Sequence, residues 1–253
     1  MHDESSASIV WLGYDAPQLP AAEVIDNTDV MFTEHAEKGA PAYNQFMAGI
    51  SATNQSPDPH VTAIGHSYGS VTLGQAALQS GGIPGVDDIV LLGSPGTGAH
   101  RADQLGVGKE HVFVGASDHD PVSMAPNKVQ SGALLVGAGA GAVVGGTAGS
   151  ALGPVGALGG ALIGGAVGGV HGWVMGDAVT DDSQNYFGTD PARKEFGAKR
   201  FLVDDGPFPV IEGGGPMDAH SNYFNPDKGR VSAGNIALIV SGKSDAIVIE
   251  EHR

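Results

Sequence analysis

A glycine-x-serine-x-glycine sequence between an apolar run and a helical pattern restricts the fold of this chain more than any other feature. The sequence Ile-Gly-His-Ser-Tyr-Gly-Ser, centred on Ser67, follows a strand expected at 61–65 and precedes a helix expected at 71–80. A strand that turns directly into a helix leaves no room for large side chains two positions before and after the serine, and Gly65 and Gly69 meet this need. We therefore expect a sharp turn that presents Ser67 at the carboxyl edge of a sheet.

This turn gives Ser67 the surroundings of a nucleophile. The backbone N–H of Tyr68, at the start of the helix, would point at a developing oxyanion with the support of the helix dipole. An unactivated serine is a weak nucleophile and needs a histidine base that a carboxylate orients. In folds with this turn, the acid follows the serine in the chain and the histidine comes last.

Two acidic residues follow the strand expected over 111–115 and so belong to the same rim as Ser67. They are Asp118 and Asp120, and either could be the acid. We prefer Asp120, because Asp-Pro-Val after such a strand is the usual form of the acid turn. An Asp-His-Asp sequence could also suggest metal ligands, but adjacent side chains point different ways and no third cluster supports them. We expect no metal and no cofactor.

His220 is the candidate base among ten histidines. It lies late in the chain, in a polar loop between a short strand expected at 201–203 and a closing helix expected at 232–240. The other candidates are terminal or lie in connecting loops, and His66 points the wrong way beside the nucleophile.

The rest of the pattern indicates an α/β fold with a mostly parallel sheet flanked by helices. A short buried strand is expected over Ser8–Leu12 and another over Asp88–Leu92. The helical pattern from 21 to 51 is broken by Gly39 and Pro41, which suggests two short helices. A helix start is expected at Asp190.

Composition excludes several classes of function. The net charge of -16 argues against nucleic acid as a partner. The chain has no cysteine, which excludes disulfides, thiolate metal sites and a cysteine nucleophile. The N-terminus is acidic and its apolar run is short, so no classical signal peptide is expected. These features leave the localisation open, and any export would need another route.

An insertion at 129–176 divides the α/β core into a first part at 1–128 and a second at 177–253. It contains no Asp, Glu, Lys or Arg, and glycine recurs in it every four residues on both sides of Pro154. The two series are Gly137, Gly141, Gly145, Gly149 and Gly153, then Gly156, Gly160, Gly164, Gly168, Gly172 and Gly176.

Such glycine zippers let two helices approach closely inside a membrane. The arms expected at 132–152 and 155–175 would each be about 31 Å long, which matches a hydrocarbon core of about 30 Å. We expect a helical hairpin that contacts a membrane. A lid on the soluble core and a flexible low-complexity loop are the alternatives.

Four motifs together are similar to those of an actinobacterial α/β-hydrolase family of unknown function. They are Trp11-Leu12-Gly13-Tyr14-Asp15-Ala16-Pro17, Gly65-His66-Ser67-Tyr68-Gly69-Ser70, Leu92-Gly93-Ser94-Pro95-Gly96 and His220-Ser221-Asn222-Tyr223-Phe224. The resemblance covers nearly everything outside the insertion.

The resemblance implies an α/β-hydrolase fold, a triad of Ser67, Asp120 and His220, and esterase or lipase chemistry on no defined substrate. Family members usually carry an earlier strand whose Pro-Gly loop lends a second oxyanion donor, and this sequence begins after that point. A missing donor lowers turnover by about 10²- to 10³-fold. Three alternatives follow: the loop around Gly13 and Tyr14 substitutes, the natural start lies further upstream, or activity is weak.

Two functional interpretations follow. The first is a serine esterase or lipase whose substrate is an acyl ester, plausibly of a lipid, and whose hairpin at 132–176 contacts the membrane. The second is a membrane-inserting or secreted effector-like protein whose hydrolase half is a scaffold with little or no turnover.

Overall fold

The computed structural model describes residues 6–17, 32–124, 150, 187–207 and 217–252. Four strands form one parallel sheet in the order β1-β2-β3-β4. They are Thr62–His66 (β1), Asp88–Leu92 (β2), Val112–Gly115 (β3) and Lys199–Arg200 (β4). The helices are Glu34–Thr53 (α1), Tyr68–Ala77 (α2), Pro121–Met124 (α3), Asp218–Ser221 (α6) and Arg230–Val240 (α7). Short 3₁₀ turns lie at Ala102–Leu105, Lys109–His111 and Ser244–Ala246. The expected α/β fold is confirmed.

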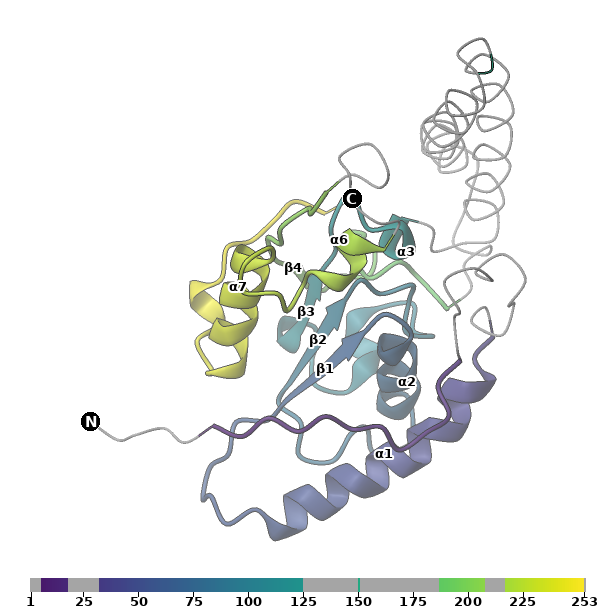
Figure 1. Ribbon diagram of the computed structural model, residues 1–253. Coiled ribbons are helices and arrows are strands. Elements are labelled where there is room, and N and C mark those ends of the chain that lie inside the picture. The colour runs from purple at the N-terminus through teal and green to yellow at the C-terminus, as the bar shows by residue number, and fades with distance from the viewer. Residues whose placement is uncertain (1–5, 18–31, 125–149, 151–186, 208–216, 253) are drawn as a thin grey trace.

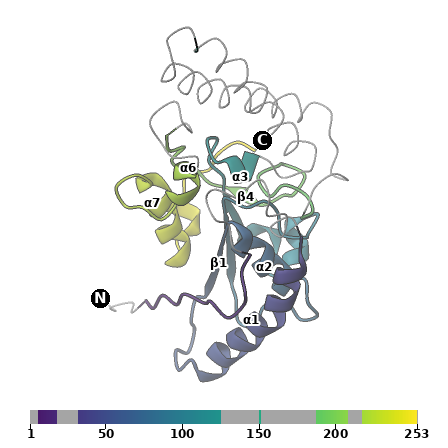
Figure 2. The same ribbon diagram turned by 45° about the vertical axis from the view of Figure 1, so that its right-hand side comes forward.

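Helices cover both faces of the sheet, with α1 and α2 on one side and α7 on the other (Figures 1 and 2). Strand β2 is buried along its whole length because its alternate side chains enter two cores. Ile89 and Leu91 pack in the core that includes Leu73 of α2. Val90 and Leu92 pack in the core that includes residues of α7.

The carboxyl ends of the strands form the edge on which the candidate site lies. In the parallel register, the last residue of β1, His66, is level with Leu92 of β2, and Leu92 is level with Gly115 of β3. The loops that follow these strands therefore leave the sheet side by side. Helices α3 and α6 lie beyond the same edge (Figure 1).

The strand expected over Ser8–Leu12 is wrong. This segment forms no ladder, and the side chains of Val10 and Leu12 are 81% and 84% exposed. Trp11 instead stacks on Tyr14 and meets the ring of Tyr43 on α1 edge-on, at centroid distances of 5.7 and 5.0 Å. Aromatic packing on the helix therefore replaces pairing with the sheet.

Helix α1 is continuous, so the expected break at Gly39 and Pro41 is also wrong. A proline inside a helix costs about 3 kcal/mol, and tertiary contacts offset this cost. Gly39 lies directly under the ring of Tyr14, where a side chain would not fit. The Asn44 side chain donates to the carbonyl of Ala76 at the end of α2, at 2.9 Å.

Two smaller expectations also shift. The residues after Asp190 form turns instead of a helix. The last strand comprises Lys199–Arg200, just before the expected range, and Phe201 makes an isolated antiparallel bridge to Ile249.

The expected hairpin at 132–176 lies outside the described residues, apart from Ser150. No helix within the described residues is long and apolar enough to cross a bilayer.

Candidate active site

Ser67 lies at a sharp turn between β1 and α2. It is the only non-glycine residue with positive φ among the residues that the structure describes, at φ 54° and ψ -133°. Such a conformation costs about 1–3 kcal/mol and persists where the surroundings enforce it. Here the Ser67 N–H donates to the Leu92 carbonyl at 3.0 Å, and the Ser67 carbonyl accepts from the Ser70 hydroxyl at 2.6 Å. The turn is thus fixed both to β2 and to the first turn of α2.

The two glycines beside the turn have different roles. A Cβ on Gly65 would lie 2.7 Å from the Cα of Ser70, so the crossing of strand and helix requires a glycine there. A Cβ on Gly69 would meet no atom of the described part within 4 Å, and Gly69 has no positive φ. The expected need for a small residue is therefore supported at Gly65, whereas at Gly69 a Cβ would fit among the described residues.

Tyr68 begins α2, so its backbone N–H has no helical carbonyl to bind. Its side chain runs towards the start of α1, where the hydroxyl donates to the Phe32 carbonyl at 2.6 Å and accepts from the Ala36 N–H at 3.3 Å. Burial raises the pKa of Tyr68 to about 12. The neutral phenol therefore links the start of α2 to the start of α1.

Asp120 ends the loop after β3 and is fully buried. One of its oxygens, Oδ1, accepts from the Val122 N–H at 2.8 Å, so the carboxylate caps α3. Pro121 occupies the first helical position, where an N–H would have no helical partner, so its missing N–H costs nothing. Both oxygens lie 2.9 Å from Nδ1 of His220. Burial would raise the pKa of Asp120, but the hydrogen bonds and charge of His220, with further donors, lower it below the ordinary value. The carboxylate is therefore charged at neutral pH.

Asp118, the alternative acid, lies apart from this pair. Its side chain is 62% exposed and accepts from Nη2 of Arg200 at 3.2 Å. The same Nη2 donates to the Ala116 carbonyl at 2.9 Å. Asp118 therefore contributes to an anchor between the acid loop and β4, and the carboxylate at His220 is that of Asp120.

His220 lies in the short helix α6, where a polar loop was expected. With Nδ1 against Asp120, its neutral ring presents Nε2 as the acceptor. Its carbonyl accepts from Nε2 of His66 at 2.8 Å, and the two imidazole rings lie 4.5 Å apart. Burial and the neighbouring charge of His220 lower the pKa of His66, which favours its neutral form. The described residues contain no hydrogen bond between Ser67 Oγ and His220, a link that often forms only once substrate is bound.

Gly93, directly after β2, makes room for the acid and the histidine. A Cβ there would lie 2.6 Å from Oδ2 of Asp120 and 2.9 Å from Nδ1 of His220. Its φ of 50° also favours glycine. The sequence predicts roles for Asp120 and His220, whereas Gly93 and Tyr223 stand in its motifs without an assigned role. Tyr223 donates to Asp120 at 2.7 Å.

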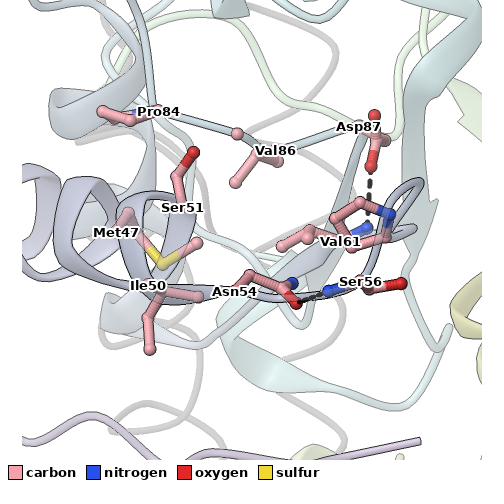
Figure 3. A pocket seen from close by; sticks show the side chains of 11 residues that line it. Met47, Ile50, Ser51, Asn54, Ser56, Val61, Pro84, Val86 and Asp87 are labelled. Carbon is pink, nitrogen blue, oxygen red and sulfur yellow. Dashed lines mark hydrogen bonds between the residues drawn. The ribbon is translucent and has the colours of Figure 1, made fainter. Parts of the chain in front are cut away.

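A cavity of about 340 Å³ lies at the opposite edge of the sheet (Figure 3). Its lining comes from the end of α1 and from the segments that lead into β1 and β2, including Met47, Asn54 and Asp87. The Val61 N–H donates to Asp87 there at 2.7 Å. None of Ser67, Asp120 or His220 lines this cavity, so the cavity is separate from the candidate active site.

Comparison with known proteins identifies the family of the fold. A family model described as alpha/beta hydrolase matches residues 1–130, about half of the chain. The chain belongs to the alpha/beta hydrolase family. No solved structure matches this hydrolase.

Mycobacterial proteins are among those similar to this chain. An uncharacterized protein of Mycobacterium bovis and one of Mycobacterium tuberculosis are each 45% identical over 118 residues, which cover 46% of this chain and 41% of the relative. A second uncharacterized protein of Mycobacterium tuberculosis is 33% identical over 245 residues, which cover 96% of this chain and 30% of the relative. The chain thus spans less than half the length of these relatives.

Proposed function

We propose that this alpha/beta hydrolase is a serine hydrolase that cleaves a carboxylic ester, with a lipid or another acyl ester as substrate. Ser67 is the nucleophile, His220 the general base and acid, and Asp120 the group that orients His220. The observation that carries the proposal is the buried Asp120 carboxylate within 2.9 Å of Nδ1 of His220, at the sheet edge where Ser67 occupies a strained turn. A serine, a histidine and an acid in this chain order are typical of the fold.

The first half of the reaction forms an acyl-enzyme. Ser67 Oγ bonds to the acyl carbon while its proton passes to Nε2 of His220. The Tyr68 N–H stabilises the resulting oxyanion at the start of α2. Nε2 then gives its proton to the departing alcohol oxygen, the carbon–oxygen bond of the ester breaks, and an ester of Ser67 remains.

The second half repeats these steps with water. Nε2 of His220 takes a proton from water, the hydroxide attacks the acyl carbon, and the proton returns to Ser67 Oγ as the acid is released. Asp120 stays a carboxylate throughout and stabilises the imidazolium that forms twice per turnover.

A fluorophosphonate probe tests the proposal, because it reacts covalently with an activated serine. We expect the wild type to be labelled and to hydrolyse short p-nitrophenyl esters, and Ser67→Ala to lose labelling and about 10⁶-fold in turnover. Ser51→Ala, on an exposed position of α1 far from the site, is the matched control and should behave as the wild type. Equal labelling of wild type and Ser67→Ala would end the assignment.

The sequence of the insertion supports a second proposal, that residues 132–176 hold the hydrolase at a membrane. Flotation with liposomes tests it, using a variant in which a short Gly/Ser linker replaces residues 131–176. The wild type should float and the variant should not. A wild type that stays at the bottom at both low and high salt would exclude membrane contact. Flotation without probe labelling would favour the effector-like interpretation over an enzyme.

A further inference from the structure

Tyr223 is a buried tyrosine whose hydroxyl contacts the proposed acid, Asp120. Only 1% of the residue is exposed, and its hydroxyl donates to Oδ2 of Asp120 at 2.7 Å. The same hydroxyl accepts from the Ser117 N–H at 3.0 Å. It therefore connects the carboxylate to the backbone of the loop that carries it.

The position of Tyr223 in the chain explains how it reaches this carboxylate. It follows His220 by three residues, and the intervening Asn222 still has helical backbone angles. Residues three apart on a helical turn share a face, so one turn directs both the His220 imidazole and the Tyr223 hydroxyl at Asp120.

The bonding around Asp120 shows what the hydroxyl adds. Oδ1 is held by the Val122 N–H and Oδ2 by Tyr223, while Nδ1 of His220 lies 2.9 Å from both oxygens. A hydroxyl has one proton. The Ser117 N–H can only donate and the Asp120 carboxylate can only accept, so that proton is directed at Asp120. Both oxygens are thus fixed, and the carboxylate cannot rotate away from the imidazole.

We propose that Tyr223 is a positioning residue for hydrolysis, whose hydroxyl fixes the orientation and limits the basicity of the Asp120 carboxylate that faces His220. The inference rests on the proposed function, since it gives Tyr223 a part in the same reaction. It differs from a packing role, because the ring alone would fill the core equally well as phenylalanine.

Tyr223→Phe tests the proposal in a double-mutant cycle with Asp120→Asn. A hydrogen bond to a charged group is typically equivalent to a factor of about 10 to 100, so we expect Tyr223→Phe to lower kcat by about 10-fold or more with little change in KM. In the Asp120→Asn background, the same substitution should lower kcat much less, because the charged partner is gone. Tyr43→Phe, which removes a hydroxyl from a partly buried tyrosine on α1, is the matched control and should leave kcat unchanged.

The pH profile separates positioning from packing. A carboxylate with one donor fewer holds the imidazolium more strongly, so the acidic limb of kcat/KM should move to higher pH in Tyr223→Phe. If Tyr223→Phe does not fold, a fluorotyrosine at 223, a stronger donor of nearly the same shape, should move that limb to lower pH. His66, the other titratable ring packed on His220, is the same in all variants.

The outcomes are distinct. An unlabelled, inactive wild type would overturn the proposed function. An active wild type would overturn the role of Tyr223 if Tyr223→Phe matched Tyr43→Phe, if its effect were the same in both backgrounds of the cycle, or if neither variant at 223 moved the acidic limb.

Discussion

The serine turn and the acid–histidine pair lie at the same sheet edge but are built in different ways. The turn at Ser67 is built largely from its own backbone: its strain, its glycine at 65 and its bond to Ser70 all fall within six residues. Its bond to the Leu92 carbonyl on β2 also joins backbone to backbone. The pair joins Asp120 to His220 across 100 positions of sequence. The turn therefore depends on backbone conformation, whereas the pair depends on side-chain packing. Substitutions should be able to damage one without the other.

Among substitutions that leave the nucleophile Ser67 in place, the largest effect is expected at the acid. Asp120→Asn should lower turnover by about 10⁴-fold, because an amide favours the wrong imidazole tautomer. Asp118→Asn keeps an oxygen for Arg200 at an exposed position and should lower turnover far less. Initial rates with p-nitrophenyl esters provide the measurement. The opposite ranking would assign the role to Asp118, and near-native activity of both variants would remove the pair from the reaction.

The next effect separates packing from backbone strain. Gly93→Ala places a methyl against Asp120 and His220, so strain of about 1–2 kcal/mol adds to an overpacking cost of about 1–3 kcal/mol. Its turnover should fall towards that of Asp120→Asn. Gly108→Ala, also at positive φ but with no described atom within 4 Å, should carry only the strain and keep its turnover.

Urea denaturation and initial rates of both variants check this expectation. The claim that Gly93 is required by the pair would be contradicted by a Gly93→Ala variant with the stability and turnover of Gly108→Ala.

The same contrast explains what could be predicted from the sequence. Strand β2 has the expected bounds because a run of four apolar residues after Asp88, with turns on both sides, is a local signal. The turn at Ser67 was predictable for the same reason. The segment at Ser8–Leu12 has an equally strong apolar pattern, yet its aromatic residue packs on α1. Apolar patterning alone does not determine which partner a short segment finds.

The surroundings of the pair were less predictable. The Asp-Pro-Val pattern after β3 favours Asp120 over Asp118, and in the structure Oδ1 of Asp120 accepts from the Val122 N–H at the start of α3. Gly93 and Tyr223 carry no comparable signal, because their roles arise only when three loops meet. Spacing does contain a hint for Tyr223, since it lies three residues after the candidate base.

The smallest effects are expected at the two glycines beside Ser67, and the two changes in unfolding free energy should have opposite signs. Gly65→Ala places a methyl 2.7 Å from the Cα of Ser70, and relief requires backbone movement that changes the turn. We expect a loss of about 1–3 kcal/mol in unfolding free energy and weaker probe labelling. Gly69→Ala enters an open position in the first turn of α2, where alanine should add about 0.5–1 kcal/mol.

Labelling of Gly69→Ala should match the wild type. Denaturation curves and labelling rates of the two variants give the comparison. Because both glycines belong to the same five-residue motif, a motif alone predicts equal losses, whereas the geometry predicts opposite signs. Equal destabilisation by both substitutions would mean that the start of α2, and not only the end of β1, packs closely against the turn. The conformation of the turn would then depend on packing as well as on its own backbone.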